Sequence, residues 1–512
     1  MNRIISRIAL SQPASQHVDQ PCNRKSVLAA AILASSMGFI DFSVIAVALP
    51  QIRSDLGAGF SQAQWVSNSY MLFLSALILL GGALGDRLGI KTVFTWGIVI
   101  FTVSSLACAI AWDAESLIGF RALQGIGAAI MIPGSMALIS INTPRAERGG
   151  ALGIWVSATA ISTSLGPLLA GVLLTYGGEA GWRWIFAINL PLGILTLLVL
   201  KGRVPTDSPV QPGILASIDW LGAILLTFAL ALLAVGLTLL GETRGTQAAM
   251  LTLGAGCATG LTAILWELRQ SDPIVDLRLF RFAAFASANA LTFLVWAAIG
   301  ALVFYLPMLM IVAWKLPAIY AGGMFVPFSI MIAALSPISG RLADRLGLRL
   351  FLVSGPLLVA AGNMVMAYGI YRQAFWSGVL PATFLIGIGV GFTASPLSTA
   401  VMNAVDDTHS GAASGINNMM ARMANLFGVA GLGALISWVY ALVIRAGDVG
   451  HEIQILMIEA GFGERLTGPL YQVKTETLQL AAMNHAAIAL CLCTAALSSI
   501  GAVMGWFGQS SG

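Results

Sequence analysis

The stretch GALGDRLGIK at residues 82–91 returns as GRLADRLGLR at residues 340–349, 258 positions further along the chain. Each copy is a short charged segment that follows a long apolar run. An offset of 262 then superposes further glycines: Gly125 on Gly387, Gly127 on Gly389, Gly153 on Gly415, Gly166 on Gly428 and Gly171 on Gly433. A shared offset across several apolar runs predicts an internal two-fold repeat of helical bundles with parallel topology.

The composition indicates lipid as the solvent of this chain. Of the 512 residues, 58% are apolar and 9% are charged, whereas a soluble domain carries about 25% charged residues. Apolar runs of about 20 residues are long enough to cross the hydrocarbon as helices. Fourteen such runs are present, and no strand-like alternation indicates a β-barrel. Their approximate bounds are 27–49, 66–85, 92–112, 116–140, 151–174, 184–200, 217–240, 249–266, 286–312, 319–340, 350–370, 376–402, 412–440 and 485–506.

The positions of Lys and Arg predict the orientation. Most of them fall in the segments that share a side with the N-terminus, and such positive segments face the cytoplasm. Both termini are therefore expected in the cytoplasm. The chain itself is expected in the cell membrane, which is the inner membrane where a cell has two. We expect an all-α polytopic protein of two six-helix bundles plus two inserted helices.

The expected domain organisation follows from the same runs. Residues 1–26 form a cytoplasmic tail, because they lack the apolar core and cleavage site of a signal peptide. The first bundle spans 27–200 and the second 286–512. The linker 201–285 carries the two extra helices, and 441–484 is expected as an external loop.

Several functional classes are disfavoured by the sequence. The net charge of +4 is too small to suggest a nucleic-acid partner, and no Gly-Lys dipeptide is present for an ATP-binding P-loop. The five cysteines show no metal-ligand spacing, and no nucleophile–base pair stands out within the spans. We therefore expect neither an enzyme nor a cofactor, with the lipid bilayer as the surroundings of a monomeric chain.

Four motifs, in order, resemble those of the major facilitator superfamily. GALGDRLGIK is similar to its loop between helices 2 and 3, and LIGFRALQGIGAA at 117–129 to its helix 4 motif. SLGPLLAG at 164–171 resembles its helix 5 antiporter motif. IDFSVIAVALP at 40–50 and WRWIFAINLPLG at 182–193 resemble the branch of fourteen-helix drug:proton antiporters. The resemblance covers nearly the whole chain after residue 26.

Asp41 and Arg121 are the candidate proton-coupling residues. Asp41 lies about fourteen residues into its span, or roughly 20 Å along the axis, where a carboxylate costs several kcal/mol unless it is paired or protonated. Arg121 is expected at a similar depth, so the two form a pair that can make and break. The resemblance also implicates the helix 4 arginine in proton coupling. The alternatives are a structural acid at a helix contact and an arginine that anchors helix ends.

The repeated charged segments are the candidate cytoplasmic gate. Carboxylates there can interact with helix N-termini and with arginines of the adjacent bundle. The alternative is a charged loop that only obeys the positive-inside bias. The candidate residues are Gly82, Asp86, Arg87, Gly89, Lys91, Asp344, Arg345 and Arg349.

The helix 5 motif supplies Gly166, Pro167 and Gly171, which allow close helix approach and a kink. The resemblance associates them with antiport, and plain packing glycines are the alternative.

Arg422, Asn417 and Asn418 are the candidate lining of a polar cavity in the second bundle, with interhelical hydrogen bonding as the alternative. No acid falls within the last six spans. That absence disfavours strongly cationic cargo and favours neutral, zwitterionic or singly charged amphiphiles.

The resemblance implies a proton-driven antiporter that exports small amphiphilic molecules such as drugs, biocides or dyes. Its partners are then the small-molecule substrate and protons. Export of an endogenous metabolite is the next alternative, and proton-coupled import is the third. The sequence does not separate them further.

Overall fold

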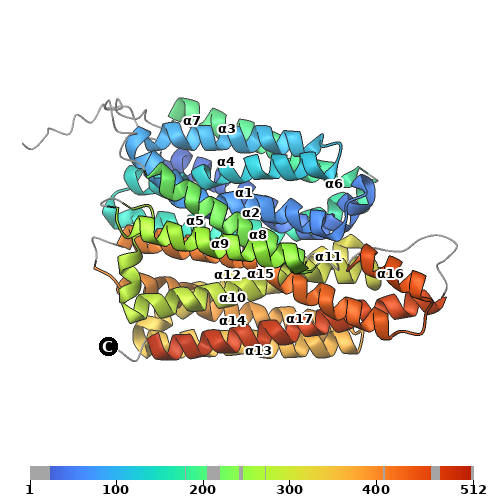
Figure 1. The fold of residues 1–512 in the computed structure, drawn as a ribbon. Coiled ribbons are helices and arrows are strands. Elements are labelled where there is room, and N and C mark those ends of the chain that lie inside the picture. Colours follow the sequence, from blue (N-terminus) through green and yellow to red (C-terminus); the bar gives the residue numbers. More distant parts are fainter. Residues whose placement is uncertain are drawn as a thin grey trace, which may run out of the picture.

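The computed structural model describes residues 24–178, 180–203, 219–241, 246–270, 273–406, 410–462 and 473–508. Figure 1 shows long, nearly parallel helices in two groups, with the first half of the chain above the second. No strand occurs in the described ranges. This arrangement suits a bilayer, because a helix satisfies its backbone hydrogen bonds within a single segment.

The first group consists of seven helical elements that make six crossings. The short α6 and the longer α7 follow one another and together make the sixth crossing. The bounds are α1 Arg24–Leu56, α2 Phe60–Leu88, α3 Ile90–Ala109, α4 Ala114–Asn142, α5 Arg145–Tyr176, α6 Gly181–Ala187 and α7 Asn189–Arg203.

The second group repeats this plan after the insert α8 Trp220–Leu240 and α9 Thr246–Glu267 and the 3-10 turn η2 Leu277–Arg281. Two of its crossings contain π-helical turns, η3 and η4, and one crossing is broken between α11 and α12. The bounds are α10 Ala283–Met308, η3 Leu309–Ala313, α11 Ala318–Gly323, α12 Phe325–Leu346, α13 Leu348–Tyr371, η4 Phe375–Val379, α14 Leu380–Asn403, α15 Ser410–Ala446, α16 His451–Ala460 and α17 Val473–Gly508.

The internal repeat is visible in the turns of the two charged segments. Gly89 ends α2 with φ 99°, and Gly347 ends α12 with φ 85°. Glycine adopts this left-handed region without the steric penalty that a Cβ imposes. The same glycine therefore makes the same sharp turn between two helices in each half.

Helix packing repeats in the same way. A Cβ on Gly125 of α4 would lie 2.5 Å from the carbonyl oxygen of Tyr70 on α2. A Cβ on Gly387 of α14 would lie 2.5 Å from the carbonyl oxygen of Phe328 on α12. Small residues let membrane helices approach this closely, so the superposed glycines of the sequence mark equivalent helix contacts.

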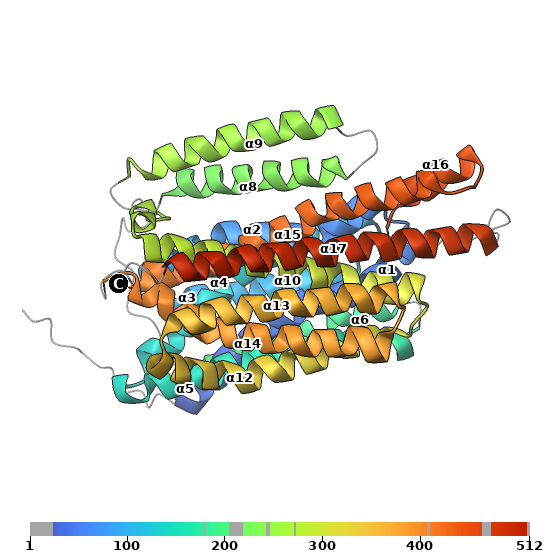
Figure 2. The ribbon, with the colours of Figure 1, turned by 90° about the horizontal axis from the view of Figure 1, so that it is seen from below.

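The expected number of crossings is consistent with the described helices. Thirteen helical segments are long and apolar enough to span a bilayer, and α5 adds a shorter apolar stretch, Ile161–Tyr176. The all-helical fold of two six-helix bundles and two inserted helices is thus confirmed. Figure 2 shows α8 and α9 at the edge of the molecule, where α8 packs against α2 and α15.

The segment 441–484 differs from the expected loop, because most of its described residues are helical. α15 continues to Ala446, α16 follows, and α17 begins at Val473; residues 463–472 lie outside the described part. α15 has 37 residues and α17 has 36, or about 55 Å each, against about 30 Å of hydrocarbon. The segment buries Met457 and Phe462 completely, and this burial stabilises helical structure outside the lipid.

Candidate functional site

The first bundle encloses an ion pair between Asp41 of α1 and Arg121 of α4. Nη1 of Arg121 contacts Oδ2 of Asp41, and each side chain is at most 1% exposed. The other carboxylate oxygen, Oδ1, accepts a hydrogen bond of 2.8 Å from the amide of Gln124. The Asn189 amide of α7 lies 3.5 Å from the same oxygen. The structure thus brings together the two residues that the sequence proposes for proton coupling.

The guanidinium of Arg121 is held on several sides. Its Nε donates to the carbonyl of Val66 on α2 at 3.0 Å, and Nη1 donates to Oε1 of Gln124 at 2.8 Å. The ring of Tyr70 lies 4.3 Å from its Cζ and that of Phe186 lies 5.7 Å away. A buried pair with this many partners is stable only as a unit, because removing one charge leaves the other uncompensated in a low dielectric.

The start of α4 sets the position of Arg121. Asp113 caps the helix: its carboxylate accepts a hydrogen bond of 2.7 Å from the backbone N–H of Ser116. This backbone hydrogen bond is the main reason why the pKa of Asp113 lies below its ordinary value. A fixed first residue fixes the helical register, so Arg121 faces α1 and α2 two turns later.

Gln124 and Asn189 are part of this site and were not predicted from the sequence. Gln124 lies one helical turn after Arg121, within the same apolar motif, and an isolated amide there was a usable signal. Asn189, in contrast, could not be predicted from sequence spacing, because it lies on α7, far from Asp41 and Arg121 in the sequence. It donates to Ser105 of α3 at 3.0 Å, and Ser105 donates to the carbonyl of Phe186 at 2.9 Å.

The helix 5 motif packs on α1 beside Asp41 and on the second bundle. A Cβ on Gly166 would collide with Oγ of Ser43 and lie 3.0 Å from the carbonyl oxygen of Ile40. A Cβ on Gly171 would lie 2.7 Å from Cα of Ile319 on α11. The carbonyl of Pro167 lies directly against Gly322 of α11, where an added Cβ would overlap it. The motif therefore touches α1, the helix that carries Asp41, on one side and the second bundle on the other.

Further cross-bundle contacts lie at the same end of the molecule. The amide of Gln64 on α2 donates to the hydroxyl of Tyr305 on α10 at 2.6 Å. Arg53, at the end of α1, donates to the carbonyls of Phe462 and Ala460 at 3.0 and 3.1 Å. By the expected orientation this is the external end, so the two bundles are in contact there.

The gate candidates are only partly described. Gly82 and the half-buried Arg87 lie in the last two turns of α2, and Gly89 caps its end. The half-buried Lys91 follows in the first turn of α3. The side chains of Asp86 and Asp344 lie outside the described residues. In the second bundle Arg345 is exposed, and the guanidinium of Arg349 stacks 3.4 Å above the ring of Trp506.

The three cavity candidates on α15 have different surroundings. Asn417 donates to Asn289 and Thr292 of α10 at 3.2 and 2.7 Å, so it makes an interhelical hydrogen bond. Asn418 is exposed and donates to the carbonyl of Ser414 at 3.3 Å. Arg422 is half-buried, and its Cζ lies 5.0 Å from the ring of Phe39 on α1.

A small cavity of about 10 Å³ lies between the bundles, close to Arg422 in sequence. That volume holds about one water molecule. Its lining comes from both halves: Phe42 and Ala46 of α1, Ser67 and Met71 of α2, Gly300, Val303 and Phe304 of α10, and Asn425 and Val429 of α15.

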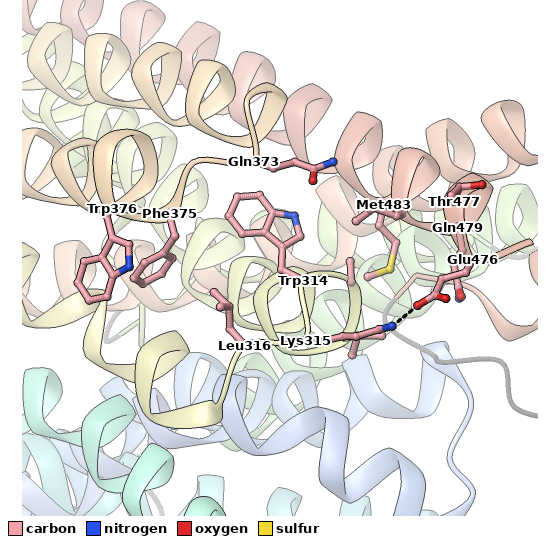
Figure 3. Close-up of a pocket in the computed structure, with 13 residues that line it drawn as sticks. Trp314, Lys315, Leu316, Gln373, Phe375, Trp376, Glu476, Thr477, Gln479 and Met483 are labelled. Carbon is pink, nitrogen blue, oxygen red and sulfur yellow. Dashed lines mark hydrogen bonds and ion pairs between the residues drawn. The ribbon is translucent and has the colours of Figure 1, made fainter. Parts of the chain in front are cut away.

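A larger pocket of about 550 Å³ opens at one end of the second bundle, which is the external end by the expected orientation (Figure 3). Trp314, Phe375 and Trp376 form aromatic walls, and Lys315 pairs with Glu476 of α17 at its edge. Its lining belongs to the second bundle alone. Lys315 and Gln373, with φ 55° and 51°, are the non-glycine residues of the described chain with positive φ, and both line it.

Fold and site together define a polytopic membrane protein with two repeated bundles and a buried charge pair. Residues 31–429 match the family model described as Major Facilitator Superfamily. Multidrug resistance protein Stp of Mycobacterium tuberculosis is 31% identical over 427 residues, covering 82% of this chain and 78% of that protein. Cephamycin export protein CmcT of Amycolatopsis lactamdurans is 33% identical, covering 78% and 83%.

Solved structures show the same fold. A bacterial homolog of the human lysosomal transporter Spinster, in an inward-facing and occupied conformation, gives a TM-score of 0.68 at 17% identity. It matches 96% of this chain and 97% of that one. A D-xylose-proton symporter gives 0.62 at 15% identity, covering 94% and 97%. The chain belongs to the major facilitator superfamily, and it is a multi-pass membrane transporter of that family.

Proposed function

We propose that this chain is a proton-coupled antiporter that exports small amphiphilic compounds across the cytoplasmic membrane. The observation that carries the proposal is the buried Asp41–Arg121 pair. The names of the relatives, which include multidrug resistance and export proteins, support export as the direction. Both termini in the cytoplasm fit the distribution of Lys and Arg, and we propose that the chain acts as a monomer.

Asp41 is suited to carry the proton. Among the described side chains the buried acids are Asp41 and Glu267, and Glu267 is the last residue of α9 in the insert. Protonation of Asp41 removes the charge that compensates Arg121. An uncompensated buried charge costs about 3–5 kcal/mol. A cost of that size approaches the roughly 5.5 kcal/mol that moves a two-state equilibrium from 1:99 to 99:1.

Proton binding can therefore drive the bundles from one arrangement to the other. Gly166 lies against α1 next to Asp41, and Pro167 and Gly171 lie against α11. A shift of α1 relative to α4 is thus passed through α5 to the contact between the bundles. This is the alternating access that an antiporter needs, with Asp86, Arg87 and Lys91 in the expected inner gate.

The inner gate has its own test. Asp86→Asn is expected to slow transport and to leave membrane insertion and substrate binding intact. Transport at the wild-type rate would remove Asp86 from the gate.

Export itself is tested by efflux assays in a host that lacks its major pumps. Cells that express the chain are loaded with a panel of amphiphilic dyes, and efflux is followed with and without a protonophore. The proposal predicts faster efflux of some dyes and loss of this gain with the protonophore. A gain that persists at full size without a proton gradient contradicts proton coupling.

A further inference from the structure

Arg422 is half-buried and, unlike the buried Arg53 and Arg121, has no polar partner among the described residues. Its guanidinium reaches from α15 of the second bundle to the ring of Phe39 on α1. Within the described part of the chain it makes no ion pair and no hydrogen bond. Arg121, in contrast, has a carboxylate, and Arg53 has three backbone carbonyls.

Among the described side chains, the charges that lie between the helices of the two bundles therefore do not balance. Asp41 and Arg121 neutralise each other, and Arg422 leaves one positive charge between the bundles. The groups that face it are aromatic: Phe39 of α1, and Tyr70 of α2, which lies within electrostatic range of both Arg121 and Arg422. A charge within a membrane is costly unless it has a partner or reaches water.

Arg422 lies on α15 between an exposed position and the small cavity between the bundles. The residue as a whole is half-buried, whereas Arg121 is buried completely. The exposed Asn418 lies one turn before it, and the small cavity between the bundles begins one turn after it at Asn425. A guanidinium offers a planar fork of N–H donors that matches a carboxylate.

We propose that Arg422 binds an anionic group of the exported molecule, which makes singly charged carboxylate amphiphiles the preferred cargo. The inference rests on the proposed export function and adds its substrate class. The carboxylate of the substrate then supplies the negative charge that Arg422 lacks among the described side chains. Phe39 and Phe42 on α1 and Met71 on α2 lie on the same side of the first bundle and can contact the apolar part of the ligand.

Anionic cargo has an electrical consequence. Exchange of one carboxylate leaving for one proton entering moves two charges in the same electrical direction. A neutral cargo moves one charge, and a singly charged cation moves none. An inside-negative potential therefore accelerates export most for the anion and least for the cation.

The test uses three probes that share a pyrene ring: pyrenebutyrate, its amide, and a pyrenebutyl trimethylammonium salt. Binding is titrated on the purified protein in nanodiscs, and transport is followed in proteoliposomes. Wild type is expected to bind the carboxylate at least about tenfold more tightly than the amide. Arg422→Gln should reduce that ratio to about one, because carboxylate binding weakens far more than amide binding, and Arg422→Lys should retain part of the ratio. Arg372→Gln, at an exposed arginine on the outer side, is the matched control.

The outcomes separate this inference from the proposed function. A wild type without preference for the carboxylate, or an unchanged ratio in Arg422→Gln, overturns the anion site. Proton-driven transport of the amide in the same vesicles would at that point still support export. If a pH gradient drives none of the three probes although the carboxylate binds through Arg422, the anion site stands and proton-driven export of this cargo fails.

Discussion

The contact between α5 and α11 is where a single methyl group should change the state of the transporter. A Cβ on Gly322 would overlap the carbonyl oxygen of Pro167 and lie 2.6 Å from its carbonyl carbon. These are backbone atoms, so no side chain can rotate to make room. Gly323, the next residue of the same helix, has nothing within 4 Å of an added Cβ. Gly322→Ala and Gly323→Ala therefore form a matched pair that differs only in this contact.

The expected magnitude follows from the cost of overpacking. Forcing an extra methyl group into a packed contact typically costs about 1–3 kcal/mol. The contact joins the bundles at the end that the expected orientation places outside, so the cost falls on the state in which these ends touch and not on a state in which they are apart. At about 1.4 kcal/mol per factor of ten, the ratio of outward-open to outward-closed molecules should rise by roughly 5- to 150-fold. Helix propensity does not predict this shift, because the stabilisation of about 1 kcal/mol that Ala gives a helix relative to Gly is not specific to either state.

The assay is a distance measurement between spin labels on the two bundles. Ser54 at the outer end of α1 and Arg372 after α13 are both exposed, so cysteines there accept labels in a cysteine-free background. Gly322→Ala should broaden the distance distribution and move it to longer values, and Gly323→Ala should match the parent. If both variants gave the parent distribution, the α5–α11 contact would not control the outer opening.

Three other substitutions test separate parts of the account. Gln124→Leu removes a hydrogen-bond donor to the Asp41 carboxylate and so destabilises the charged form of Asp41 by about 1–3 kcal/mol. The pH at half-maximal export should therefore rise. An unchanged pH profile would exclude this role of Gln124. Gln373→Gly relieves a positive φ, so the thermal midpoint of unfolding should rise or stay unchanged. Arg372→Gly, at a residue with φ −82°, should lower the thermal midpoint. Equal losses in the two variants would show that no strain is stored at Gln373. Arg53→Ala deletes the bonds to the carbonyls of Ala460 and Phe462, so hydrogen exchange in α16 should accelerate, and unchanged protection there would argue against this anchor.

Much of the fold was predictable because the bilayer restricts the choices. A lipid-exposed chain has to form helices or a closed barrel, and without strand-like alternation the apolar runs translate into helical crossings with few alternatives. The repeated glycines were equally informative: Gly89 and Gly347 need a left-handed φ, and Gly125 and Gly387 need room for a carbonyl. Each of these constraints acts locally and is visible in the sequence.

The helices within residues 441–462 and 473–484 were not predictable from apolar runs. Their residues are too polar to resemble a crossing, and the helices are stabilised by tertiary contacts such as Leu478 against Gly447 and the burial of Phe462. The π-helical turns η3 and η4 were not predicted from the sequence, for a related reason. They are local adjustments of backbone hydrogen bonding inside long apolar runs and leave the apolar pattern unchanged.

The site was predictable in its charges and not in its amides. A charged residue within a span stands out because of its cost, which singled out Asp41, Arg121 and Arg422. Whether Gln124 or Asn417 faces a charge or a neighbouring helix depends on how the helices are rotated against each other. The structure turns Gln124 toward Asp41 and Asn417 toward α10. A single sequence does not encode that rotation in its spacing.

The most direct test of the central claim is proton-driven export by Asp41→Asn in proteoliposomes. Asn at position 41 imitates the protonated acid and cannot release a proton, so substrate binding and exchange down a substrate gradient should persist. Uphill export driven by a pH difference should fall to the level of empty vesicles, because no proton is carried back. Full pH-driven accumulation by Asp41→Asn would contradict the account, since the coupling proton would then travel by another route or the driving ion would not be a proton.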